Sequence, residues 1–148
     1  MIRERLSENY HRDEFACKCG CGQDTVDYLL IILLEIVHFI FDKKYGEDSY
    51  NGRVSVYIVS GNRCKKHNIS IPGSSNTSKH LVGKAVDFVI YYYDKKGNKK
   101  YISPREIYEV LCRNYKNKYC FILHDNFVHA DVRKIAYRKD ATTKESKV

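Results

Sequence analysis

The segment SKHLVGKAVDF, residues 78–88, contains the pattern on which the expected fold and site depend. Six residues separate His80 from Asp87, and the segment continues directly into an apolar run rich in β-branched residues. Such a run predicts a strand, so His80 lies at the end of a polar loop and Asp87 lies inside the strand that follows it. Gly83 lets the backbone pass close to a site there, and the small side chain of Ala85 leaves room beside it.

Cap and turn signals define the elements on either side of this segment. A first helix is expected to begin after Asp24 as N-cap, with Asp27 in a capping-box position, and to end near Lys44. A second helix follows Ser103, with Pro104 at its first position. The remaining segments are predicted to be strands at 53–61, 84–93, 119–123 and 127–133, a hairpin return at 101–102 and a long loop over 62–79. This order predicts an α+β fold with a mainly antiparallel sheet.

The length and composition indicate a single folded domain. The chain has 148 residues, of which 43% are hydrophobic, and it contains 13 tyrosines and 6 phenylalanines. This is enough to bury a core without additional cross-links. We expect the domain to span residues 1–137, followed by a polar, disordered tail at 138–148.

The charge pattern limits the classes of partner. A formal net charge of +8 favours polyanions, namely nucleic acid, anionic lipid or an anionic cell-wall polymer. The lysines are scattered rather than gathered in one stripe, which is typical of a solvated surface. Specific nucleic-acid binding lacks a recognised motif and would show a steep salt dependence. The apolar run 28–41 is shorter than the roughly 20 residues of a membrane span, so none is expected.

Six cysteines form a second pattern. Cys17, Cys19 and Cys21 alternate, which would place their thiols on one side of an extended segment, while Cys64 lies far along the chain. Three clustered thiols suggest either a zinc site, to which Cys64 can add a fourth ligand, or one or two disulfides. In either case we expect these cysteines to be structural, with the CKCGC segment held near Cys64.

A third pattern lies in FVHADVR, residues 127–133. The two-residue period of a strand places His129 and Asp131 on one face, together with Phe127. Two histidines and one carboxylate are a common ligand set for catalytic zinc, with a fourth position left for water. The set suggested here consists of His80, Asp87 and His129.

These segments resemble, in order, the motifs of peptidase family M15, the zinc D-alanyl-D-alanine carboxypeptidases, whose fold is shared with the Hedgehog signalling domain. SKHLVGKAVD matches the signature S-x-H-x-x-G-x-A-x-D. DEFACKCGCG at 13–22 resembles the N-terminal segment of a subgroup found in phage and prophage lysis enzymes. SGNRCKKHN at 60–68 resembles the S-G-x-R loop, and FVHADVR resembles the strand of the final ligand. The resemblance covers roughly residues 10 to 137.

The resemblance implies a role for each matching residue. It implies that His80, Asp87 and His129 bind Zn²⁺. Arg63 matches the arginine that polarises the scissile carbonyl or holds a substrate carboxylate, for which a fixed guanidinium is suited. Ser78 matches the signature serine near the substrate.

One position departs from the family pattern. Members of the family place a Glu or Asp general base three residues before the last histidine ligand, and here that residue is Asn126, which cannot accept a proton. Regular strand parity would put both Asp125 and Asp131 on the His129 face. We expect Asp125 to act as the base and Asp131 to orient a ligand histidine, and His124 is a third candidate.

The expected function is therefore a zinc metallopeptidase, carboxypeptidase or endopeptidase, that hydrolyses peptide bonds of bacterial peptidoglycan. The charged N-terminus lacks the apolar core of a signal peptide, so we expect an endolysin-like monomer that is cytoplasmic until released and then acts at the cell wall. Its partners would be peptidoglycan peptides and anionic wall polymers. The alternative is a non-catalytic binding module on the same fold, which the Asn126 substitution supports.

Overall fold

The computed structural model describes residues 3–143 and has the expected α+β composition. The helical elements are the 3-10 turns η1 (Arg12–Phe15) and η2 (Lys79–Val82) and the α-helices α1 (Tyr28–Tyr45), α2 (Lys65–Ser70) and α3 (Pro104–Asn114). The strands are β1 (Ser55–Ser60), β2 (Ala85–Tyr93), β3 (Lys99–Tyr101), β4 (Cys120–Leu123), β5 (Val128–Asp131) and β6 (Tyr137–Asp140). Within the described part of the chain, no helix is both long and apolar enough to cross a membrane.

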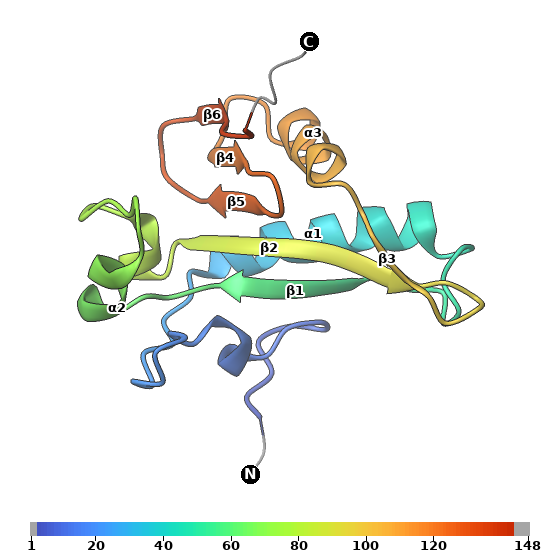
Figure 1. Cartoon of the computed structure of the whole chain (residues 1–148), viewed down its shortest axis with the longest axis horizontal. Coiled ribbons are helices and arrows are strands. Elements are labelled where there is room, and N and C mark those ends of the chain that lie inside the picture. Colours follow the sequence, from blue (N-terminus) through green and yellow to red (C-terminus); the bar gives the residue numbers. More distant parts are fainter. Residues whose placement is uncertain (1–2, 144–148) are drawn as a thin grey trace.

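The strands form one sheet in the order β1-β2-β5-β4-β6, and β3 pairs with the far end of β2 (Figure 1). All pairs are antiparallel except β4 with β6. The connection between β4 and β5 is a tight hairpin. Between β2 and β5, in contrast, the chain contains β3, α3 and β4. Strands β2 and β5, which carry Asp87 and His129, are therefore neighbours in the sheet although about forty residues separate them in the chain.

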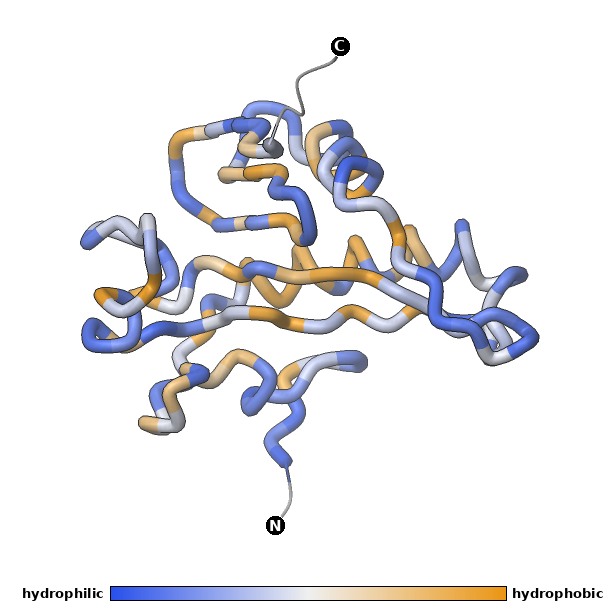
Figure 2. The backbone as a smooth tube through the Cα atoms, in the orientation of Figure 1, coloured by the Kyte–Doolittle hydropathy of each residue, from blue (hydrophilic) through white to orange (hydrophobic). Residues whose placement is uncertain are grey.

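Alternation along β2 sorts the residues onto two different faces. Val86, Phe88 and Ile90 are fully buried and belong to the hydrophobic core, which α1 and α3 complete. Figure 2 shows the apolar residues running along β1, β2 and α1, and α1 lies behind the strands in the same view. Asp87 lies between two of these core residues in the sequence and therefore points to the opposite face. The core thus holds β2 in place while its other face carries polar groups.

The first helix begins later than the sequence pattern predicts. Asp27, not Asp24, is the N-cap, and its carboxylate accepts a hydrogen bond from the Leu29 amide at 2.8 Å. The Asp27 amide donates to the carbonyl of Gly83 at 2.8 Å, so the segment before α1 is bonded to the loop that precedes β2. Gly83 has φ +71°, and a Cβ there would lie 2.4 Å from the carbonyl oxygen of Thr25. The close approach at Gly83 is to the segment before α1, and not to the site as we expected.

The expected loop over 62–79 is partly helical, and that prediction was wrong. It contains α2 and the beginning of η2. The thiol of Cys64 accepts a hydrogen bond from the amide of His67 and caps α2. The buried Asn68 donates to the Ser75 carbonyl at 2.9 Å and thus fixes the chain that follows. A six-residue helix is too short to show a helical period, and this is why the pattern missed it.

The expected tail also requires a correction, because β6 extends the sheet to Asp140. Arg138 donates to the carbonyls of Tyr119 at 2.7 Å and Tyr115 at 2.6 Å, and its guanidinium lies over the ring of Phe121. One arginine thus attaches an otherwise polar strand to β4. Residues 144–148 of the expected tail lie outside the described residues.

Candidate metal centre and active site

Three side chains from separate elements meet on the polar face of the sheet. His80 comes from η2, Asp87 from β2 and His129 from β5, where Asp87 and His129 are direct partners in the register. The Oδ1 atom of Asp87 lies 3.3 Å from Nε2 of His80 and 2.9 Å from Nδ1 of His129. His80 and Asp87 are buried, with exposed fractions of 2% and 7%. The structure therefore brings together the three metal ligands that the sequence predicts.

The orientation of His80 is set by the loop at 60–63. Its Nδ1 atom lies 2.7 Å from the carbonyl oxygen of Gly61 and donates to it, so Nε2 is the nitrogen that faces Asp87. The carbonyl of His80 in turn accepts hydrogen bonds from the amide of Arg63 and from the side chain of Asn62, both at 2.9 Å. Ser78 caps η2 by accepting from the amide of His80 at 3.2 Å. These contacts fix the orientation of the imidazole.

The second histidine is oriented from the opposite side. Nε2 of His129 lies 2.7 Å from the Oδ2 atom of Asp131, which leaves Nδ1 directed at Asp87. Burial lowers the pKa of His129, but the hydrogen bonds to Asp131 and Asp87 outweigh it and raise that pKa well above its usual value. Without a metal, a proton on His129 thus balances two carboxylates. A divalent cation can take the place of that proton between His129 and Asp87.

The donor set fits zinc. Nitrogen or oxygen atoms of His80, Asp87 and His129 all lie within 4.8 Å of one another. Burial opposes ionisation of Asp87, but hydrogen bonds from His129 and His80 hold its pKa below the usual range, so the carboxylate is charged. Two neutral imidazoles and one carboxylate are the ligand types of three-residue catalytic zinc sites.

Arg63 lies directly beside this group. Its guanidinium donates to Ser60 at 3.2 Å, to Asn68 at 3.2 Å and to the Oδ2 atom of Asp87 at 3.3 Å. Burial lowers the pKa of Arg63 and the charge of Asp87 opposes that effect. Three acceptors therefore hold a positive charge in one orientation next to the metal ligands.

A family model described as Peptidase M15 matches residues 8–131 of the chain. The chain belongs to peptidase family M15. Neither a curated protein nor a solved structure matches it. The match spans the S-G-x-R loop, η2 and β5, so the family assignment covers every residue of the candidate site.

Asp131 of this M15 chain is fully buried beneath His129. Arg133 donates from Nε to Oδ1 and from Nη2 to Oδ2, both at 2.7 Å, so both carboxylate oxygens are engaged. With no exposed surface and with Arg133 on both of its oxygens, this carboxylate is closed to solvent. Its geometry supports the predicted role of orienting His129.

The strand parity that we used for Asp125 does not hold in this M15 chain. The amide of His124 donates to the carbonyl of Phe127 at 3.1 Å, which makes Asp125 and Asn126 the two central residues of the β4–β5 turn. The carboxylate of Asp125 accepts from the amide of Thr143 at 3.0 Å and from its hydroxyl at 2.7 Å. A turn has no strand alternation, so Asp125 is not aligned with His129.

His124, the third candidate for the proton acceptor, lies on the site face. The register pairs Ile122 with His129, and the hairpin continues with His124 opposite Phe127, so both histidines point to the same side. The imidazole stacks on the ring of Phe127, with centroids 4.3 Å apart. Burial lowers the pKa of His124, and this effect outweighs the opposing charge of Asp87. The ring is therefore neutral at neutral pH.

A groove of about 500 Å³ adjoins this histidine. The groove begins at the β4–β5 turn. From there it follows the part of β2 beyond Phe88, which is not paired with β5. Its walls include the aromatic rings of Tyr57, Tyr101 and Phe127 and the side chain of Val89. Val89 lies two residues along β2 from Asp87 and on the same face, so an apolar groove there suits a ligand that lies along β2.

Proposed function

We propose that this M15 chain is a zinc-dependent peptidase that hydrolyses peptide bonds of bacterial peptidoglycan. The observation that carries the proposal is the convergence of Nε2 of His80, Oδ1 of Asp87 and Nδ1 of His129. Each imidazole has its other nitrogen bonded to a fixed acceptor, the carbonyl of Gly61 or the carboxylate of Asp131. That is the arrangement by which a protein orients histidines toward a metal.

His80, Asp87 and His129 would hold the zinc ion. When bound, zinc lowers the pKa of a water molecule and polarises the carbonyl of the substrate. Arg63 would donate to the carbonyl oxygen as negative charge develops on it, or to a carboxylate at the end of the substrate. Its contacts with Ser60 and Asn68 hold the guanidinium before substrate arrives, so little reorganisation is needed.

We assign the proton acceptor to His124 rather than to Asp125. A general base must be neutral or anionic and must face the reacting water. His124 satisfies both conditions, since its pKa is lowered and its strand position points it to the site face. Asp125 would first have to give up its hydrogen bonds to Thr143. His124 would then return the proton to the leaving amine.

The groove beside Phe127 would receive the peptide, and the net charge of +8 would hold the protein on anionic wall polymers. The setting that we propose is release of a monomeric, endolysin-like protein from the cytoplasm, followed by action at the bacterial wall. The bond would be the D-Ala-D-Ala bond, the L-Ala-D-Glu bond or a cross-bridge bond, and the fragments distinguish these three.

Mass spectrometry of purified peptidoglycan after incubation with zinc-loaded protein tests this function. We expect fragments with one newly formed amine and carboxylate, and we expect none with His80→Ala. A Lys95→Ala variant, changed at an exposed turn, serves as the matched control and should cleave like the wild type. Tight binding of wall fragments without any cleavage would instead support the non-catalytic binding module.

A further inference from the structure

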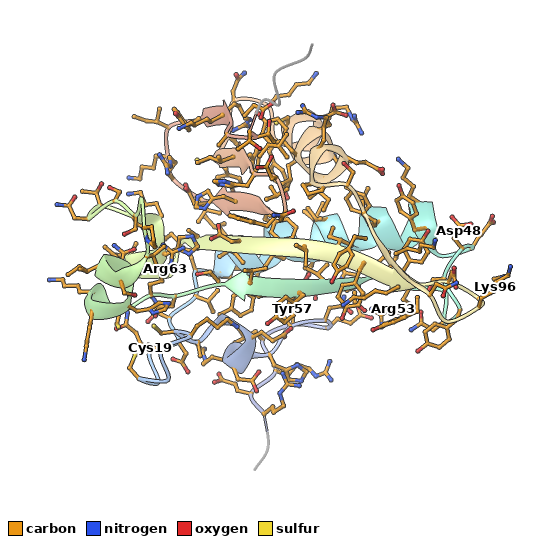
Figure 3. All side chains as sticks on the ribbon, in the orientation of Figure 1. Cys19, Asp48, Arg53, Tyr57, Arg63 and Lys96 are labelled. Atoms are coloured by element: carbon orange, nitrogen blue, oxygen red, sulfur yellow. The ribbon has the colours of Figure 1, made fainter. Side chains whose placement is uncertain are left out.

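Four cysteines gather at the end of the sheet that carries Arg63. The thiols of Cys17, Cys19, Cys21 and Cys64 all lie within 4.8 Å of one another. Figure 3 shows Cys19 and Arg63 at the same end of the sheet, next to α2. None of the four belongs to the His80–Asp87–His129 site, and the proposed reaction uses none of them.

The spacing of these sulfur atoms suits a metal better than a disulfide. The Sγ atom of Cys19 lies 3.4 Å from that of Cys17 and 3.7 Å from that of Cys64. A disulfide requires about 2.0 Å between its sulfur atoms. Four thiolates arranged as a tetrahedron around zinc, with Zn–S bonds of about 2.3 Å, lie about 3.8 Å apart. These two sulfur–sulfur distances are therefore already close to the edge length of a zinc tetrahedron.

The backbone is shaped to direct these thiols inward. Instead of the extended segment that alternation predicts, residues 17–22 form a turn in which Gly20 and Gly22 have φ +84° and +87°. The amide of Cys17 donates to Gln23 at 2.7 Å and closes the turn. The amide of Cys64 donates to the sulfur of Cys17 at 3.4 Å. Amide donors stabilise the negative charge of a thiolate, which is the form that binds metal.

We propose that Cys17, Cys19, Cys21 and Cys64 bind a second zinc ion in a closed, structural site. Four cysteine ligands complete a tetrahedron and leave no position for water, which distinguishes this site from the three-residue centre. Metal binding releases the thiol protons and leaves two net negative charges on the site. Lys65, adjacent to Cys64 in the sequence, is among the cations available to balance them.

This site would attach the N-terminal segment to the loop that carries Arg63. Cys64 immediately follows Arg63, and the side chain of Gln23 donates to the Arg63 carbonyl at 3.3 Å. The amide of Thr25 donates to the side chain of Asn62 at 2.9 Å, and Asn62 contacts the His80 carbonyl. A metal at the cysteines would therefore restrain Arg63 directly and His80 through Asn62. Loss of the metal would loosen Arg63.

Zinc content measured by mass spectrometry tests the assignment. The Cys19→Ser/Cys21→Ser variant should contain one zinc ion fewer per chain than the wild type, whereas His129→Ala should lose a different one. A variant with all three substitutions should contain neither zinc ion. The zinc content of each site can thus be measured independently of the other site. Cys112→Ser, a change at a cysteine outside the cluster, is the matched control and should leave the zinc content unchanged. An unchanged zinc content in the double cysteine variant would overturn the proposal, as would iron in place of zinc.

Alkylation of the wild-type protein provides a test that does not depend on the folding of a variant. Cys19 and Cys21 have exposed side chains, so free thiols there would react quickly. We expect both to resist alkylation in the zinc-loaded native protein when a phosphine reductant is present, and to react once a chelator is added. Reaction before the chelator is added would overturn the proposal. So would protection that the reductant alone removes, since that result identifies a disulfide.

Discussion

The Nε2 atom of His129 lies 2.7 Å from the Oδ2 atom of the fully buried Asp131. Because Arg133 binds both oxygens of that carboxylate, the acceptor cannot rotate away from the ring. The remaining nitrogen of His129 therefore faces Asp87 in a fixed geometry. Asp131 thus orients the ring of His129, a proposed ligand, although it is not a proposed ligand itself.

Replacing Asp131 with Asn should weaken zinc binding by about 10–100-fold, because an amide orients the imidazole less well than a carboxylate. The affinity can be measured by competition with a coloured chelator. Asp125→Asn is the matched control, since Asp125 lies in the turn and contacts Thr143. Equal zinc affinity in the two variants would show that the contact with His129 does not position the ligand.

His124→Gln should reduce turnover by about 10²–10⁴-fold while zinc stays bound, because the amide cannot accept the proton of the attacking water. Asp125→Asn should keep most of the activity. Rates of amine release from peptidoglycan and zinc content are measured on the same preparations. The opposite order of the two variants would return the role of the base to Asp125, as the sequence pattern first suggested.

Arg63→Lys should lower kcat by about 10²–10³-fold, the usual loss when one fixed donor to a developing oxyanion is removed. Lysine keeps the charge but cannot reach Ser60, Asn68 and Asp87 together with one ammonium group. Lys66→Ala, a change at a nearby exposed position, should leave kcat unchanged. An Arg63→Lys enzyme with wild-type kcat would show that charge alone is sufficient there.

Gly83→Ala should destabilise the protein by about 1–3 kcal/mol more than Gly97→Ala, because only the first adds a methyl group against backbone. Both glycines have positive φ, +71° and +84°, so the strain of the left-handed conformation is common to both. A Cβ at Gly83 meets the Thr25 carbonyl at 2.4 Å, whereas nothing lies within 4 Å at Gly97. Thermal unfolding of both variants measures the difference, and equal losses would contradict the crowding argument.

The sequence predicts which side chains share the site face better along strands than in turns, for a physical reason. His80, Asp87 and His129 lie in or next to strands, where a period of two fixes which side chains share a face. Asp125 lies in a two-residue turn, where that period has no meaning. The carboxylate oxygens of Asp125 bond to Thr143, eighteen residues along the chain, and no local pattern predicts such a contact.

Contacts distant in sequence also explain the errors at the ends of elements. The start of α1 depends on the hydrogen bond between Asp27 and Gly83, and β6 depends on carbonyls of Tyr115 and Tyr119 that accept from Arg138. Helix α3, in contrast, begins at Pro104 as its local signals predict. Caps and periods in the sequence predict local structure, whereas these pairings depend on the assembled sheet.

The most direct test of the central claim is zinc added back to metal-stripped protein while amine release from purified peptidoglycan is followed. We predict that wild-type activity rises with zinc to a plateau, and that His129→Ala, examined at the same zinc concentrations, stays at the background rate. Hydrolysis by His129→Ala equal to that of the wild type, or wild-type hydrolysis that persists without any metal, would contradict the account.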